Sequence, residues 1–224
     1  MSLNKAKRNL AEAIGNTDLV KITSLSELTG CDIYVKCEFQ NPGGSVKDRA
    51  ALFMIEDLER RGLITPGKTT ICEGTGGNTG IGLALVANAK NLKLKLSMPQ
   101  AIAKEKIQLM RALGAQVRLC PGVPFTDTKN HYYHVAKNTA RDNKDHVFAN
   151  QFENLWNGAA HYFSTGPEIF TQTGTYLSSP MHWMVSVRSW GEAQLYNSAS
   201  SSKTSMREKC FVVIQLELLG IQSQ

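Results

Sequence analysis

The sequence lacks most of the features that mark a membrane, metal-binding or disulfide-stabilised protein. None of its five cysteines belongs to a Cys-x-x-Cys pair. No apolar run approaches the roughly 18 residues that a membrane span needs. The net charge of +6 comes from 25 basic and 19 acidic residues, which are spread along the chain rather than gathered into one patch. These absences favour a protein with free thiols and with no membrane or nucleic-acid partner.

The free thiols indicate a reducing compartment, so we expect a cytoplasmic protein. A mitochondrial location is the alternative, because the start MSLNKAKRNL is basic and has no acid before Glu12. An ordinary basic first helix would look the same. His131, His134 and His161 share no ligand spacing with a nearby cysteine or acid, so they are interpreted as ordinary surface or helix histidines and no metal site is expected.

Strand-like and helix-like segments alternate over the first three quarters of the chain. The predicted helices begin with one that Ser45 caps and that ends before Gly62, and the last is a helical region through Glu168 and Phe170. This alternation predicts an α/β fold, a parallel sheet covered by helices on both faces. The other predicted segments are strands at 32–39, 69–72, 92–98, 116–119 and 146–148 and helices at 80–89, 104–113 and within 125–142.

The character of the sequence changes after Gly174. Residues 175–224 hold ten serines, two of the 18 glycines and no aspartate, together with Trp183 and Trp190. A flexible tail is one interpretation. A flexible segment is rarely this rich in Trp and Met, so we favour an alternative reading frame or a retained intron joined to a shortened protein.

A first candidate site lies in NPGGSVKDR at 41–49, at a predicted strand-to-helix junction. Lys47 falls in the first helical turn, where the helix dipole and partial burial lower the pKa of an amine and favour a Schiff base with an aldehyde cofactor. Gly43 and Gly44 would let the backbone approach a bound ring. A lone lysine in such a turn is far more often a solvated charge.

A second candidate site is EGTGGNTG at 73–80, also between a strand and a helix. Such a turn points backbone N–H groups at an anion, which suits a phosphate or a carboxylate. It lacks the spacing of a dinucleotide site and no Walker lysine follows, so a nucleotide-binding module is a weak alternative. We expect both turns at the carboxyl ends of strands in one sheet.

Five stretches resemble the cysteine synthase and cystathionine β-synthase family of fold-type II pyridoxal-phosphate enzymes, and they are most similar to fungal cysteine synthases. The order and spacing of the family are kept over most of the chain. The segment around Lys47 favours this branch over the threonine and serine dehydratases. The stretches are AIGNTDLVKI at 13–22, EFQNPGGSVKDRAA at 38–51, EGTGGNTGIGLA at 73–84, QFEN at 151–154 and TGPEI at 165–169.

The resemblance implies a tryptophan synthase β-like architecture and pyridoxal 5'-phosphate as the cofactor. It implies that Lys47 binds the cofactor and later takes the substrate α-proton, and that Asn78 hydrogen-bonds the ring hydroxyl. The reaction implied is β-replacement, in which O-acetylserine and sulfide give cysteine and acetate. A homodimer is expected for the family. Gly76 departs from the serine of many relatives, which leaves the amino-acid substrate open. The residues implied to hold the substrate carboxylate are Thr75, Gly76, Gly77, Thr79 and Gln151.

A second glycine-rich loop, which in this family binds the cofactor phosphate, is not recognisable after Gly174. Loss of its charge-assisted hydrogen bonds predicts weakened retention of the cofactor. We therefore expect a chain truncated after about residue 174, without the C-terminal part of the larger domain and too short for a cystathionine β-synthase regulatory domain. A non-catalytic family member that binds a full-length relative is the alternative. The predicted domains are 1–45 with 147–174, the smaller domain 46–146, and a poorly ordered non-family tail, 175–224.

Overall fold

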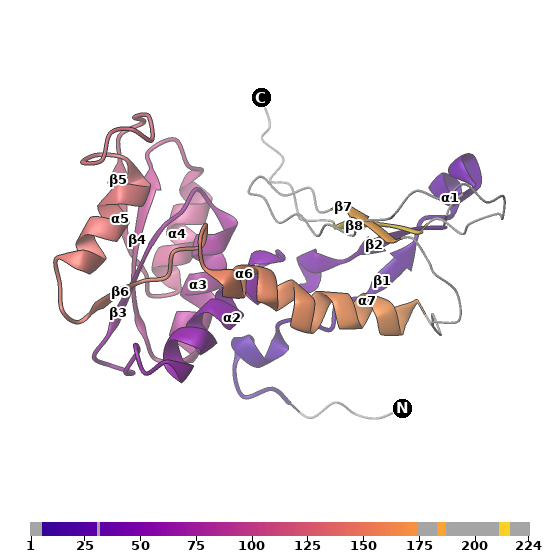
Figure 1. The fold of residues 1–224 in the computed structure, drawn as a ribbon, viewed down its shortest axis with the longest axis horizontal. Coiled ribbons are helices and arrows are strands. Elements are labelled where there is room, and N and C mark those ends of the chain that lie inside the picture. The colour runs from indigo at the N-terminus through magenta and orange to yellow at the C-terminus, as the bar shows by residue number, and fades with distance from the viewer. Residues whose placement is uncertain (1–5, 31, 174–182, 187–210, 216–224) are drawn as a thin grey trace.

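The structure is a computed structural model that describes residues 6–30, 32–173, 183–186 and 211–215, the last two segments by their backbone alone. Within these residues the fold is α/β, as predicted. No helix in this part of the chain combines the length and the apolar character needed to cross a membrane. Figure 1 shows two groups of strands with a long helical segment running between them.

The first sheet is parallel and has four strands in the order β5-β4-β3-β6. Helix α5 (Tyr132–Arg141) packs on β3, β4 and β6, and α3 (Asn78–Ala89) lies on the other face of the sheet (Figure 1). The strands are β3 (Thr70–Gly74), β4 (Lys93–Pro99), β5 (Gln116–Cys120) and β6 (His146–Phe148).

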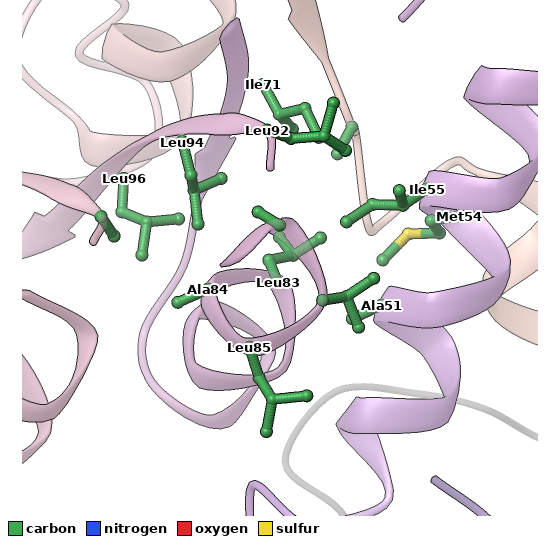
Figure 2. Packing of buried hydrophobic residues seen from close by; sticks show 14 of the residues in the cluster. Ala51, Met54, Ile55, Ile71, Leu83, Ala84, Leu85, Leu92, Leu94 and Leu96 are labelled. Atoms are coloured by element: carbon green, nitrogen blue, oxygen red, sulfur yellow. The ribbon is translucent and has the colours of Figure 1, made fainter. Parts of the chain in front are cut away.

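Helix α3 forms the centre of the hydrophobic core. All of its residues from 79 to 87 are buried, because the sheet covers one side and α2 (Lys47–Arg60) covers the other. Figure 2 shows α3 between Leu94 and Leu96 of the sheet and Ala51 and Met54 of α2. A helix that is apolar on all sides is the kind that a globular core encloses. Helix α4 (Lys104–Ala112) packs beside α3 and β5.

The second sheet has the order β1-β2-β8-β7. Strand β1 (Leu19–Lys21) runs antiparallel to β2 (Asp32–Lys36), whereas β8 (Phe211–Gln215) is parallel to both β2 and β7 (Trp183–Ser186). Most of the predicted tail lies outside the described residues. Of its two described strands, β8 pairs with β2, and β7 pairs with β8. The division of the chain into domains stays a prediction.

Helices α6 (Leu155–Ala160) and α7 (Gly166–Gln172) are joined by a π-helical turn, η3 (His161–Thr165). The three form one continuous helical segment that crosses from α2 toward the second sheet (Figure 1). A π-helical turn of this kind is uncommon and is often found near functional sites. The segment therefore places the TGPEI stretch beside the N-terminal part of the chain.

Several predicted boundaries were wrong. The strand predicted over 32–39 ends at Lys36, and a 3-10 turn, η2 (Glu38–Gln40), follows it. Val46 rather than Ser45 occupies the N-cap position of α2. The helix expected within 125–142 does lie in that range, as α5. Strands β7 and β8 had no prediction, and neither did three elements before β2: a 3-10 turn η1 (Leu10–Ala13), strand β1 and helix α1 (Thr23–Thr29).

Candidate functional site

Lys47 is the first residue of α2 and is half-buried. Its backbone N–H donates to Ser45 Oγ at 3.1 Å, so Ser45 contacts the start of the helix without being its N-cap. The side chain thus leaves α2 at its N-terminal end, where the helix dipole places partial positive charge. This is the position predicted for it from the sequence.

The turn before Lys47 is fixed by Asp48, which is fully buried. The N–H of Gly43 donates to Asp48 Oδ2 at 2.5 Å, and a Cβ on Gly43 would clash with that carboxylate. Gly44 follows with a φ of 77°, a left-handed conformation that L side chains rarely adopt. Both glycines are therefore needed for the backbone path that leads into α2.

The second glycine-rich turn leads into α3, which packs against Lys47 of α2, although the two turns belong to different sheets. Lys47 follows β2, whereas the turn at 75–77 follows β3, so the prediction of a single sheet was wrong. What brings them together is the close packing of α3 on α2. A Cβ on Gly82 of α3 would lie 2.8 Å from the backbone oxygen of Lys47. Only a glycine allows this approach without a shift of one helix.

The turn itself, residues 75–77 with Asn78 and Thr79 at the start of α3, is named the substrate loop below. Thr75 is buried, its N–H donates to Ser97 O at 3.0 Å, and its Oγ1 accepts from the N–H of Gly77 at 3.2 Å. Around Gly76 there is open space, since a Cβ there would meet no atom within 4 Å. The loop therefore has a rigid base and an open tip.

Gln151 is tied to the base of the substrate loop by Glu73, a buried carboxylate. Glu73 accepts the N–H of Gly74 at 2.8 Å and the N–H of Gln151 at 3.0 Å. The side-chain amide of Gln151 donates to Gly74 O at 2.9 Å. Burial raises the pKa of Glu73 to about 7, despite these N–H donors. Residues 73 and 151 are far apart in the sequence, and the structure brings them together at the base of the substrate loop.

His161 was not predicted as part of the site. It was interpreted as an ordinary surface or helix histidine, and it lies in the helical turn η3. The side chain is buried, and its Nδ1 lies 3.0 Å from Thr165 Oγ1. Burial, and then the positive charges of Lys47 and Arg49, lower the pKa of His161 to about 4. The imidazole of His161 is therefore neutral near pH 7, and the charge of Lys47 contributes to its low pKa. Its place between the QFEN and TGPEI stretches was the one available signal.

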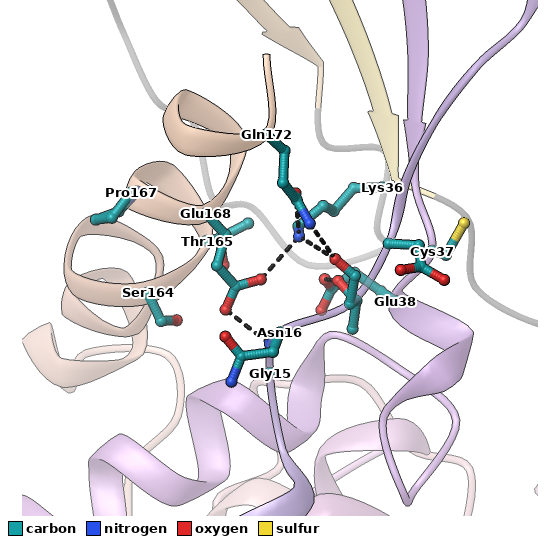
Figure 3. A network of polar contacts seen from close by, with 12 residues as sticks. Gly15, Asn16, Lys36, Cys37, Glu38, Ser164, Thr165, Pro167, Glu168 and Gln172 are labelled. Atoms are coloured by element: carbon teal, nitrogen blue, oxygen red, sulfur yellow. Dashed lines mark hydrogen bonds and ion pairs between the residues drawn. The ribbon is translucent and has the colours of Figure 1, made fainter. Parts of the chain in front are cut away.

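A buried ion network holds the start of α2 to α7. Figure 3 shows the part of this network around Lys36 and Glu168. Arg49 donates to Glu38 from Nε at 2.8 Å and to Glu168 from Nη1 at 2.6 Å. Lys36 donates to Glu168 Oε2 at 2.7 Å and is itself 1% exposed. Burial acts to raise the pKa of Glu168, but hydrogen bonds from Arg49 and Lys36 outweigh it and lower that pKa to about 2. The network connects the TGPEI stretch to the helix that carries Lys47.

A cavity of about 310 Å³ borders this network. Leu52, Phe53 and Phe163 are among the residues that line it, and none of the predicted site residues does. Within the described ranges, no three His, Cys, Asp or Glu side chains gather as a group that could hold a metal ion. The chemistry-bearing residues are instead concentrated where the N-terminal ends of α2 and α3 meet.

Comparison with known proteins assigns this arrangement to a family. Residues 10–193 match the family model described as pyridoxal-phosphate dependent enzyme. The chain is 52% identical to cysteine synthase 1 of Emericella nidulans over 76% of this chain and 45% of that protein. It is 50% identical to cysteine synthase 1 of Neurospora crassa over 78% of this chain and 46% of that protein. The chain therefore spans about half the length of the curated relatives it matches.

Two solved structures show the same fold. A hydrogen sulfide-producing enzyme of Fusobacterium nucleatum superposes with a TM-score of 0.70 at 38% identity, over 84% of this chain and 59% of that one. An O-ureido-L-serine synthase superposes with a TM-score of 0.70 at 33% identity, over 81% of this chain and 55% of that one.

Proposed function

Because the chain belongs to the family of pyridoxal-phosphate-dependent enzymes, we propose that it carries the part of a cysteine synthase-like site that contains the cofactor lysine, Lys47. The proposed reaction is β-replacement, in which O-acetylserine and sulfide give cysteine and acetate. The observation that carries the proposal is the junction of α2 and α3, where Gly82 packs closely on the backbone of Lys47 in the helix that follows the substrate loop. The cysteine synthases among the relatives support the choice of reaction.

The described residues fit the ring end of pyridoxal phosphate. The junction offers an amine at Lys47, an amide at Asn78 and open space around Gly76, where a flat ring and an amino acid can approach the backbone. Lys47 would bind the aldehyde, and Asn78 would hydrogen-bond the ring hydroxyl. When bound, the cofactor supplies an electron sink for the charge that develops at the substrate α-carbon.

The residues of this chain have separate proposed roles in the reaction. The Lys47 amine takes the proton from the substrate α-carbon, which requires it to be neutral at that moment. The N–H groups at the start of α3 face the substrate carboxylate and stabilise its charge. The residues proposed to bind that carboxylate are Thr75, Gly76, Gly77, Thr79 and Gln151. We also propose that this chain holds the cofactor weakly, because the glycine-rich loop that binds the cofactor phosphate in the family is not recognisable in this sequence.

The proposed setting of the protein follows the same reasoning. We propose an amino-acid substrate and sulfide as its small-molecule partners and a homodimer as its assembly. The cytoplasm is the proposed compartment, with the mitochondrion as the alternative. Cys37, Cys72 and Cys120 support a reducing environment, since all three are buried free thiols.

The first experiment is an absorbance titration of the full chain with pyridoxal phosphate, followed by borohydride reduction and peptide mass analysis. We expect a visible band that forms in the wild type and in Lys104→Ala, a control at an exposed lysine, but not in Lys47→Ala. The reduced adduct should map to Lys47. Folded protein that gives no Lys47-dependent band would contradict the proposal and would indicate a family member that does not hold the cofactor.

A further inference from the structure

Lys106 makes a contact beside the substrate loop that the proposed reaction does not use. Its Nζ donates to Asn78 Oδ1 at 3.2 Å. The same ammonium lies 3.6 Å from the position that a Cβ on Gly77 would occupy. A cation from α4 therefore reaches across to the N-terminal end of α3, the end that carries the substrate loop.

This position is unfavourable for the helix that carries it. Lys106 is the third residue of α4, and cations in a first turn lie at the positive end of the helix dipole. An acid such as its neighbour Glu105 is the stabilising choice there. Lys104 in the same turn is exposed, whereas Lys106 is half-buried. A residue that opposes the local preference of its helix is expected where it serves a contact outside the helix.

The chemistry of the contact fixes the orientation of the Asn78 amide. An ammonium has three donors and no acceptor, so the amide atom that faces it must be the oxygen. The NH2 group is consequently on the side away from Lys106. A hydrogen bond from a charged donor also polarises the amide, which strengthens its N–H groups as donors to a further acceptor.

We propose that Lys106 is a positioning residue of the site, which orients Asn78 so that its NH2 group is presented to the ring hydroxyl of the cofactor. Its charge also adds to the positive field at the N-terminal end of α3, next to the region where the substrate carboxylate would bind. This inference rests on the proposed function, because the ring hydroxyl belongs to the cofactor. It assigns Lys106 a role through Asn78, and no direct contact with the reacting atoms.

The test compares four forms of the full chain: wild type, Lys106→Met, Lys106→Arg and the control Lys104→Met. Methionine keeps the length of the side chain and removes the donors, and arginine restores donors to the amide oxygen. In the protein without ligand, the NMR resonances of the Asn78 side-chain NH2 should shift in Lys106→Met. They should stay near their wild-type positions in Lys106→Arg and in Lys104→Met.

The second readout is the dissociation constant of pyridoxal phosphate itself. We expect Lys106→Met to weaken binding about tenfold, the effect of one hydrogen bond to a charged group. Lys106→Arg should recover most of the affinity, which a role in packing alone would not predict. Unchanged Asn78 resonances in Lys106→Met would overturn the inference, and so would unchanged affinity in that variant.

These outcomes separate the inference from the function on which it rests. If the wild type takes up no pyridoxal phosphate, the proposed function fails. The Asn78 resonances then decide alone whether Lys106 orients the amide. If the wild type binds the cofactor through Lys47 and Lys106→Met binds it equally well, the proposed function stands and the inference fails.

Discussion

His161 gives the site its clearest expected response to pH at the scale of a single residue. Burial and the charges of Lys47 and Arg49 lower its pKa from 6.5 to about 4. As the pH falls, the unfolded chain therefore binds the proton first, and stability is lost between pH 6.5 and pH 4. Full protonation would cost about 3 kcal/mol, from the size of this shift.

The measurement is urea unfolding of wild type and His161→Gln across this pH range. Glutamine stays neutral, so the variant should lose less stability than the wild type on acidification. The comparison must be a difference between the two proteins, because Glu73 titrates in an overlapping window with the opposite sign. Its pKa is raised to about 7, so its contribution to stability falls as the pH rises from 4.5 to 7. Parallel curves for both proteins would contradict the prediction.

Glu168 is the residue on which the buried ion network depends. Substitution by Gln would leave Lys36 and Arg49 with fewer anionic partners in a buried setting, at a cost of about 3–5 kcal/mol. Chemical denaturation of Glu168→Gln measures this loss, and Glu27→Gln on the exposed side of α1 is the control. The double variant Lys36→Met/Glu168→Gln should regain part of the stability, because it removes one unpaired cation. If the double variant recovers no stability, the unpaired Lys36 contributes little to the stability that Glu168→Gln loses.

At the scale of secondary structure elements, the contact between α2 and α3 depends on Gly82. Alanine there would place a Cβ 2.8 Å from Lys47 O, so the helices must move apart, at a cost of about 1–3 kcal/mol. Gly158→Ala in α6 is the matched control, since a Cβ there meets nothing within 4 Å and alanine favours the helix. Thermal unfolding should show a loss for Gly82→Ala and a small gain for Gly158→Ala. Equal effects would exclude close packing as the cause.

The elements also show how far the sequence predicted the structure. Strand β6 occupies the predicted residues 146–148, and α4 begins at the predicted Lys104, because periodicity and helix signals are local. The partner of a strand is not local, which is why β2 and β3 were wrongly placed in one sheet. Strand β1 and helix α1 are short and carry weak patterns, so they had no prediction.

The candidate site follows the same division between local and tertiary information. Lys47 and Asn78 lie at helix N-termini, as predicted from the glycines and the alternating segments before them. Lys106 and His161 had no functional prediction, because their places in the site come from the packing of α4 and η3 rather than from a motif. The predicted roles of the site residues remain to be tested by the experiments above.

At the scale of the whole molecule, the helical segment 155–172 and the ion network connect the two sheets. The second sheet has four strands, as the first does, and β2 is one of its two inner strands, with β1 on one side and β8 on the other. Val35 pairs with Ile214 in the parallel ladder between β2 and β8. Without β8, the N–H and C=O groups on that edge of β2 would be unpaired, and an open edge of this kind promotes association with other chains.

A chain that ends at residue 173 should therefore melt at a lower temperature than the full chain and should form larger species in solution. A chain that ends at residue 215 is the control, because it keeps both β7 and β8 and loses only the last nine residues. Thermal unfolding measures the melting temperature, and light scattering after size-exclusion chromatography measures the size of the species in solution. If both shortened chains behave alike, the pairing of β8 with β2 contributes little, and the first 173 residues fold without the last two strands.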